Sequence, residues 1–196
     1  MTLTPSTRLA GWLLFAIAIG CPIWSSAADE ERLPSENAWQ SRVAAELNLL
    51  GHRNWIVVAD SAYPAQSRAG IETVYIGGDQ AAAVAEVLKM VDRAKHVRGI
   101  IYTDAELKAV PEADAPGVEA YRGRVKTMLE DRPVSTELHE SIIAKLDEAA
   151  KTFRILILKT DCTIPYTSVF IQLDCGYWSA EMEQRLREAL DDGASP

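Results

Sequence analysis

Basic residues are scarce in this chain of 196 residues, which has 20 Lys and Arg against 28 Asp and Glu and a formal net charge of -8. Proteins that bind nucleic acid or an anionic membrane present a basic face to the phosphates. The composition therefore argues against both partners and favours a neutral ligand. With 48% hydrophobic residues, the chain has enough apolar side chains for one good core, so we expect a single domain.

Histidine and cysteine are also scarce, with three of each. His52, His96 and His139 are too far apart for the usual spacing of metal ligands, and no Cys-x-x-Cys accompanies them. The chain lacks the Gly-x-Ser-x-Gly turn of many hydrolases, and Gly77-Gly78-Asp79 lacks the third glycine and the lysine of a phosphate loop. We therefore expect no metal and no cofactor.

Apolar runs are short, and the longest stands at the N-terminus. Arg8 precedes the run Leu9 to Ile19, which falls short of the roughly 20 residues of a spanning helix. Pro22 and the small residues Ser26-Ala27-Ala28 follow, in a pattern that signal peptidase favours. This predicts a signal peptide over residues 1–28, export to the periplasm or the medium, and a mature domain over 29–196.

Two other interpretations of the N-terminus remain open. Ala18-Ile19-Gly20-Cys21 resembles a lipobox, so the chain could instead be a lipoprotein anchored at Cys21. A membrane anchor is the third, although Pro22 would interrupt its end. In the first two interpretations the mature chain leaves the cytoplasm.

The two cysteines of the mature chain, Cys162 and Cys175, flank an apolar segment at 168–173. If these six residues form a strand, a rise of roughly 3.3 Å each separates the thiols by some 20 Å. A disulfide needs Cα atoms within roughly 7 Å. We therefore expect two free thiols and no bond within one chain.

Helical and extended patterns alternate after residue 29. Apolar residues at helical spacing predict helices at 35–50, 79–96, 121–129, 135–151 and 179–192, the last as an addition at the C-terminus. Short apolar runs predict strands at 55–59, 73–76, 99–102, 153–158 and 168–173. Strands that are apolar throughout are buried on both faces of a sheet, so the predicted fold class is α/β.

Two titratable residues, His52 and Asp60, flank the strand predicted at 55–59. Ligands in α/β proteins collect beyond strand ends, which makes both residues candidates. An extended chain of eight residues spans roughly 20 to 26 Å, more than one small metabolite. Unless residues 51–54 fold back, the two side chains meet one ligand only when His52 of one copy faces the strand end of a neighbour.

Two motifs resemble the D-ribose pyranase and L-fucose mutarotase family. The first is Gly51-His52, an apolar strand ending at Asp60, and Pro64 four residues later. The second is the run Asp161-Cys162-Thr163-Ile164-Pro165-Tyr166-Thr167-Ser168 before an apolar strand, which resembles the family's Glu-Cys-x-Pro-Tyr-x-Asn. The resemblance extends loosely from about residue 40 to 176.

The resemblance implies a three-layer α/β/α fold with a mixed, mostly parallel sheet, assembled into rings of five or ten copies. It implies a free monosaccharide, such as ribose or fucose, bound between neighbouring subunits. His52 would be the proton donor, and Asp60, Tyr166 and Ser168 would contact the sugar. Histidine with a pKa near 6.5 suits proton transfer at neutral pH, and ring opening of a sugar needs no cofactor.

The chain departs from the family pattern at three points. Ile164 is one residue more than the family run contains, and Ser168 replaces an asparagine. The family also has a further basic contact, for which His139 is the candidate, with Lys145 and Lys151 as alternatives. These departures leave open a second function, a non-catalytic sugar-binding or oligomeric scaffold protein of the same fold.

Overall fold

A computed structural model describes residues 38–193 of the chain, and these belong to one compact unit. The predicted signal peptide with its alternative lipidation site at Cys21 lies outside the described residues. Among the residues described, no helix combines the length and the apolar character needed to cross a membrane. The division into a leader and a mature domain stays a prediction.

Helices and strands are interspersed along the chain, as the sequence predicted. The helices are α1 (Ala38–Leu47), α2 (Gln80–Arg93), the 3-10 helix η1 (Ala105–Ala109), α3 (Val118–Leu129), α4 (His139–Ala149) and α5 (Ala180–Gly193). The strands are β1 (Trp55–Ala59), β2 (Ile71–Tyr75), β3 (Val97–Asp104), β4 (Val134–Glu137), β5 (Ile155–Lys159) and β6 (Val169–Cys175).

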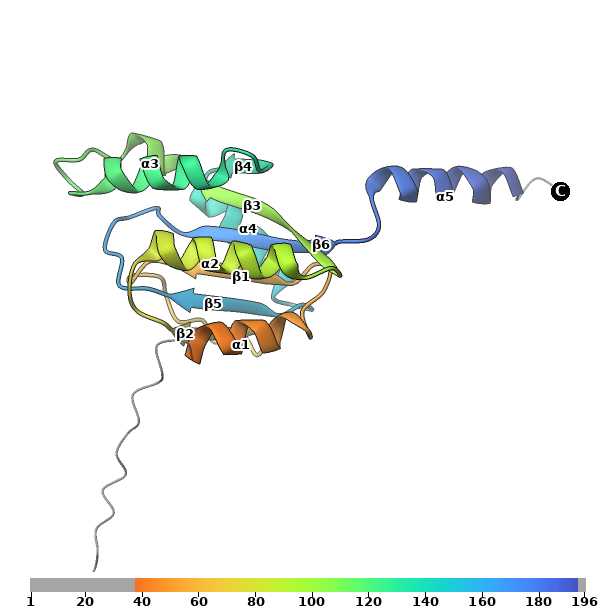
Figure 1. Ribbon diagram of the computed structural model, residues 1–196, viewed down its shortest axis with the longest axis horizontal. Helices are drawn as coiled ribbons and strands as arrows, with labels where there is room; N and C mark the ends of the chain where they lie inside the picture. Colours follow the sequence, from red (N-terminus) through yellow and green to blue (C-terminus); the bar gives the residue numbers. More distant parts are fainter. Residues whose placement is uncertain (1–37, 194–196) are drawn as a thin grey trace, which may run out of the picture. The chain divides into compact units, whose positions relative to one another are not determined.

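The six strands form one sheet in the order β2-β5-β1-β6-β3-β4 (Figure 1). The pairs β1/β5, β2/β5 and β3/β4 are parallel, while β6 runs antiparallel to both β1 and β3. The sheet is therefore mixed and mostly parallel, which confirms the prediction. Because β1 and β3 share an antiparallel neighbour, they run in the same direction and their C-terminal ends lie at the same edge.

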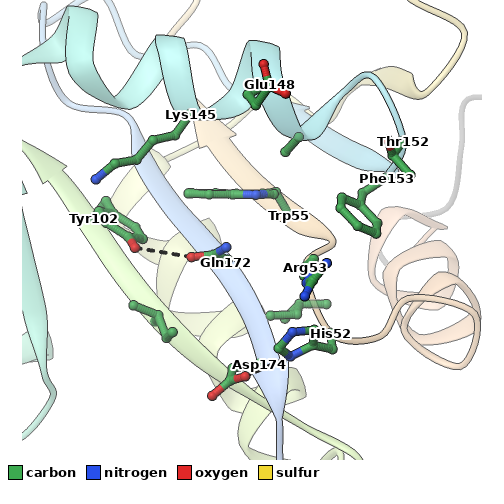
Figure 2. Close-up of a pocket in the computed structure, with 13 residues that line it drawn as sticks. His52, Arg53, Trp55, Tyr102, Lys145, Glu148, Thr152, Phe153, Gln172 and Asp174 are labelled. Carbon is green, nitrogen blue, oxygen red and sulfur yellow. Dashed lines mark hydrogen bonds and ion pairs between the residues drawn. The ribbon is translucent and has the colours of Figure 1, made fainter.

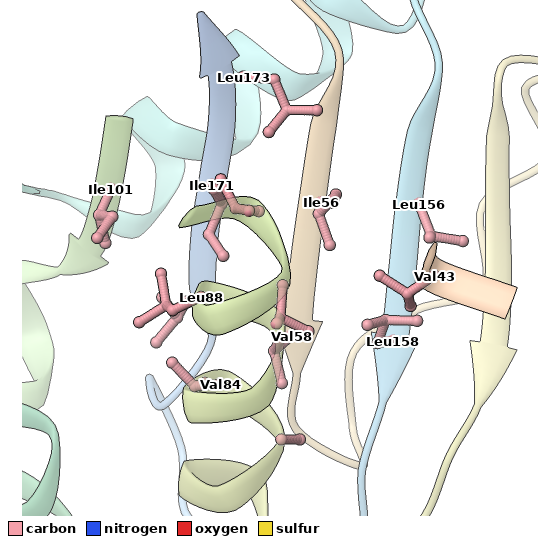
Figure 3. Packing of buried hydrophobic residues seen from close by; sticks show 14 of the residues in the cluster. Val43, Ile56, Val58, Val84, Leu88, Ile101, Leu156, Leu158, Ile171 and Leu173 are labelled. Carbon is pink, nitrogen blue, oxygen red and sulfur yellow. The ribbon is translucent and has the colours of Figure 1, made fainter. Parts of the chain in front are cut away.

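Helices α1, α2 and α3 cover one face of the sheet. Apolar side chains of α2, such as Val84 and Leu88, lie over Val58 and Ile171 in the cluster drawn in Figure 3. The alternation of β1 places Ile56 in the same cluster, because successive strand residues point to opposite faces. This cluster is the larger half of the core.

Helix α4 covers the opposite face. Its buried residues Ile142 and Leu146 pack in a second cluster with Trp55, Val57 and Phe170. Every residue of β1 is buried, because helices cover both of its faces. The two helical layers and the sheet confirm the predicted three-layer α/β/α architecture.

The segment 134–137 differs from the prediction: it is a strand, not the start of a helix from Ser135. Val134 and Thr136 are β-branched, and β4 pairs in parallel with β3 at the edge of the sheet. The helix begins only at His139. The four residues of β4 are exposed or partly exposed, so they show little apolar alternation. The helical periodicity of the residues that follow is stronger, and it predicted a helix there.

Side chains cap the N-terminal ends of two helices. The Asp79 side chain accepts a hydrogen bond from the Ala82 backbone N–H at the start of α2. At the start of α5, the Ser179 hydroxyl accepts one from the Met182 backbone N–H at 3.2 Å. None of residues 180–191 of α5, whose burial is described, is buried.

Cys162 and Cys175 lie on opposite sides of β6 along the chain, as the sequence predicted. Cys162 precedes the strand by several residues, and Cys175 is its last residue. Both are free thiols.

Candidate functional site

His52 and Asp60 lie at opposite ends of β1 and line different cavities. His52 sits in the turn between α1 and β1, and Asp60 directly follows the last residue of β1. His52 lines a cavity of about 590 Å³, and Asp60 lines another of about 380 Å³. The turn at 51–54 does not fold back over β1, so the separation predicted within one chain is confirmed.

The histidine of the larger cavity is held by a carboxylate (Figure 2). His52 Nδ1 lies 2.8 Å from Asp174 Oδ1. The Arg98 Nε–H donates to Asp174 Oδ2 at 2.9 Å. Partial burial would raise the pKa of Asp174, but the hydrogen bonds from Arg98, the Cys175 backbone and His52 outweigh it and lower the pKa. The ionised Asp174 therefore holds the His52 ring through Nδ1.

The rest of this cavity combines aromatic rings with polar groups. The Trp55 and Tyr102 rings lie 5.3 Å apart between centroids, and Lys145 Nζ lies 4.8 Å above the Tyr102 ring. The Tyr102 hydroxyl donates to Gln172 Oε1 at 3.1 Å (Figure 2). Apolar surface with a few placed polar groups is typical of small-molecule sites. Lys145, an alternative for the basic contact, therefore lies in the cavity of His52.

The smaller cavity lies at the C-terminal edge of β1 and β3. Asp60, Tyr63, His139 and Tyr166 all line it, and they come from three separate segments of the chain. The rings of His139 and Tyr166 meet edge to face, with 5.8 Å between their centroids. The edge beyond the carboxyl ends of parallel strands is where α/β folds bind their ligands.

Asp60 is fixed by two hydrogen bonds in this cavity. Its Oδ1 accepts from the Ala62 backbone N–H at 2.9 Å, and its Oδ2 accepts from the Ser168 hydroxyl at 3.0 Å. Ser168 itself is only 2% exposed and is absent from the residues that line the cavity. Ser168 therefore bonds to Asp60, and its contact with a sugar stays a prediction.

His139 is the first residue of α4, and it lies in the cavity with Asp60 and Tyr166. Its Nδ1 lies 3.1 Å from Asp104 Oδ1. Of the three basic residues considered for this contact, His139 is the one that lines the smaller cavity, while Lys151 is paired with Glu148 on the surface.

Sequence reasoning missed Asp104 and Tyr63. Asp104 is the last residue of β3 and is buried, and Tyr63 is 4% exposed. Burial raises the pKa of Tyr63 above its ordinary value, and the charges of Asp104 and Asp60 add to the effect. The signal that could have found Asp104 is the one that found Asp60, an acidic residue directly at the end of an apolar strand.

Backbone strain occurs beside the candidate residues of both cavities. Within the described chain, Arg53 with φ 74° and Tyr166 with φ 59° are the non-glycine residues in the left-handed region. Such conformations cost about 1–3 kcal/mol each and concentrate at functional sites. Arg53 follows His52, and Tyr166 lies against His139.

A buried polar network holds the loop that carries Tyr166. The side chain of Gln80 accepts from the Thr160 hydroxyl at 2.8 Å and donates to the Thr167 carbonyl, which also accepts from the Tyr121 hydroxyl at 2.6 Å. Gln80, Thr160 and Thr167 are at most 2% exposed. The network fixes both ends of the 160–168 loop, so Tyr166 is held in position although its side chain is 40% exposed.

Metal ligation receives no support from this geometry. Among residues 38–193, no three His, Cys, Asp or Glu side chains gather so that they could hold a metal ion. The pairs His52–Asp174 and His139–Asp104 instead have the geometry of hydrogen-bonded acid–base pairs.

No family model and no curated protein matches the chain. Solved structures do match. RbsD from Bacillus subtilis, complexed with D-ribose, has 20% sequence identity and a TM-score of 0.50, over 71% of this chain and 94% of RbsD. The fucose mutarotase from Streptococcus pneumoniae, in complex with L-fucose, has 17% identity and a TM-score of 0.46, over 76% and 99% of the two chains.

FucU from Bifidobacterium longum has 17% identity and a TM-score of 0.47, over 71% of this chain and 96% of FucU. The similarity to RbsD confirms, at the level of the fold, the resemblance that the two sequence motifs indicated. The chain has the RbsD-like α/β fold.

Proposed function

We propose that the protein is a monosaccharide mutarotase or pyranase, an isomerase that interconverts the anomers or ring forms of a free sugar. The observation that carries the proposal is the meeting of Asp60, His139 and Tyr166 in one cavity of about 380 Å³. That volume is in the range of small-molecule sites. The RbsD-like fold supports the proposal, since the RbsD structure contains D-ribose.

The chemistry needs one group to remove a proton and another to deliver one. A base takes the proton of the anomeric hydroxyl while an acid protonates the ring oxygen, and the bond from the anomeric carbon to the ring oxygen breaks. The open-chain aldehyde then recloses on its other face, or through another hydroxyl, and both protons return. Each positioned acid or base contributes about 10²- to 10⁴-fold to the rate.

His139 and Asp60 provide acceptor groups in the smaller cavity, and His52 provides the donor. Since His52 lies at the other end of β1, the complete site needs His52 from a second copy of the chain. A surface that meets a different surface of its neighbour generates a closed ring when the rotation fits. We therefore propose a homo-oligomeric ring with the sugar between subunits.

Asp60→Asn is expected to lower kcat/KM for anomer exchange about 10- to 100-fold, because the neutral amide loses a charge-assisted hydrogen bond to a sugar hydroxyl. Exchange NMR on ribose, fucose and other free sugars at anomeric equilibrium measures the rate without any coupled enzyme. Asp114→Asn, on an exposed loop, is the matched control. Wild-type rates no faster than buffer for every pentose and hexose would contradict the proposal.

The second candidate is a sugar-binding protein without catalysis. The observation that favours it is the incomplete acid–base pair of a single chain, whose His52 and Asp60 occupy separate cavities. Titration calorimetry that detects sugar binding, together with NMR that detects no acceleration of exchange, would support this candidate over the mutarotase. Turnover by the wild type would exclude it.

We further propose that the chain acts after export. The basis is the signal-peptide pattern that ends at Ala28, outside the described residues. Expressed in a bacterial host, the protein should appear in the periplasm or the medium with Asp29 as its first residue, as N-terminal sequencing would show. A lipid-modified Cys21 would identify the lipoprotein instead, and an intact leader in the cytoplasm would contradict both.

A further inference from the structure

The carboxyl group of Asp104 is the most deeply buried titratable group beside the smaller cavity. Its side chain is 0% exposed, and its Oδ1 lies 3.1 Å from His139 Nδ1. Its Oδ2 is buried and has no hydrogen-bond partner among residues 38–193. Among residues 38–193, the Asp104 carboxyl group therefore has a single hydrogen-bond partner, Nδ1 of His139.

This arrangement is a poor way to stabilise a fold. Burial raises the pKa of the Asp104 carboxyl to about 6, although the charge and the hydrogen bond of His139 oppose the shift and the carboxylates of Glu106 and Asp60 add to it. A buried carboxylate with one partner is unfavourable relative to an apolar or amide side chain of similar size. Groups that are perturbed in this way beside a cavity are candidates for a functional role.

The remaining contacts of His139 fix where its ring lies. The His139 backbone N–H donates to both carboxylate oxygens of Glu106 at 3.1 Å, which anchors the first residue of α4. The ring packs against Tyr166 and Phe170, with 5.8 Å and 6.4 Å between centroids. With Nδ1 engaged by Asp104, Nε2 is the ring nitrogen left for a ligand in the cavity.

We propose that Asp104 is a positioning residue for sugar exchange, which holds His139 with its proton on Nδ1 and leaves Nε2 as the proton acceptor for a sugar hydroxyl. The inference rests on the proposed function and extends it to a residue outside the cavity wall. A carboxylate accepts hydrogen bonds only, so an ionised Asp104 excludes the tautomer with a bare Nδ1. It acts through His139 and does not touch the sugar.

The test is Asp104→Asn, an isosteric and neutral substitution. We expect kcat for anomer exchange to fall about 10- to 100-fold with KM changed less than about threefold, as for other residues that orient a reacting group. Nitrogen-15 NMR of the imidazoles should find the Nδ1–H tautomer of His139 in the wild type and its loss in the variant. With three histidines in the chain, the three ring systems are readily assigned.

Glu106→Gln is the matched control, because Glu106 bonds to the backbone of His139 and not to its ring. It should leave the ring tautomer unchanged. An Nε2–H tautomer in the wild-type protein, or an Asp104→Asn variant with the wild-type tautomer and kcat, would overturn the proposal. A wild type that exchanges no sugar but loses the Nδ1–H tautomer on Asp104→Asn would refute the mutarotase and support the positioning role.

Thermal unfolding separates positioning from a structural role. The folded-state pKa of about 6 lies above the ordinary value of an aspartate, so the folded state binds the proton more tightly than the unfolded state. The contribution of the Asp104 carboxyl group to the free energy of unfolding is therefore present at low pH and is lost as the pH rises through 6. The Tm of Asp104→Asn should therefore rise relative to the wild type between pH 4 and 7.5. A variant Tm that lies several degrees below the wild-type Tm throughout this pH range would instead indicate that Asp104 has a structural role.

Discussion

His52→Ala should slow anomer exchange about 100-fold or more, because the site loses the group that protonates the ring oxygen. The fold should be unaffected, since the His52 side chain is 53% exposed and its polar contact is to Asp174. Exchange NMR with ribose and fucose measures the loss. His96→Ala is the matched control, because the His96 ring bonds to backbone carbonyls at the end of α1 and lines neither cavity.

Mixing two impaired variants tests whether subunits share the site. In rings that assemble at random from equal amounts of His52→Ala and Asp60→Asn, about one quarter of the interfaces combine an intact His52 with an intact Asp60. Exchange should recover toward about one quarter of the wild-type rate. The double variant His52→Ala/Asp60→Asn should show no such recovery, because none of its interfaces contains an intact His52 or an intact Asp60. A mixture with no recovery, or a wild type that is monomeric and active, would contradict the shared site.

The two histidines differ in the environment of their carboxylate partners. Arg98 and a backbone hydrogen bond lower the pKa of Asp174, while burial raises the pKa of Asp104. Carboxylates whose environments push their pKa values apart mark different roles in acid–base catalysis. Asp174 holds the ring of His52, the proposed donor, and the buried Asp104 holds the ring of His139, the proposed acceptor. The proposed acid and base therefore come from opposite ends of the same sheet.

Much of the fold was predictable because its signals are local. The apolar run 55–59 coincides with β1, and the helices predicted from residues 79 and 179 are α2 and α5, capped by Asp79 and Ser179. The strand β4 was missed because pairing with β3, a contact between distant segments, stabilises it more than its own pattern does. Periodicity reports burial along one segment, and it does not report which segments become neighbours.

The candidate site was predictable only in part for the same reason. Asp60 and Tyr166 stand in recognisable motifs, and both line the smaller cavity. Ser168 stands in the same motif, but its burial turns its hydroxyl toward Asp60, and burial of a single polar residue is not visible in a sequence. Asp104 resembles any polar residue at the end of a strand until the fold brings α4 beside it.

Phe170 connects the core to the site, which predicts a large effect for its removal. It is 0% exposed in β6, and its ring lies 6.4 Å from both the Tyr63 and the His139 rings. Phe170→Ala removes a fully buried aromatic side chain and leaves a cavity, so the free energy of unfolding should fall by about 3–5 kcal/mol. Denaturant unfolding, with a lower midpoint and an unchanged slope, measures the loss.

The neighbouring residue in β6 provides a control that separates the loss of stability from the loss of sugar exchange. Ile171 is equally buried but points to the opposite face of the sheet, so Ile171→Ala should lower stability by about 2–5 kcal/mol without moving His139. Under conditions where both variants are folded, Phe170→Ala should exchange sugars more slowly than Ile171→Ala, because Tyr63 and His139 lose the surface that they pack on. Phe170→Leu, which retains part of that surface, should fall between the wild type and Phe170→Ala in both measurements. Equal rates for the two alanine variants would show that the site tolerates the loss of the Phe170 ring. That result would contradict a site that depends on a fixed His139 ring.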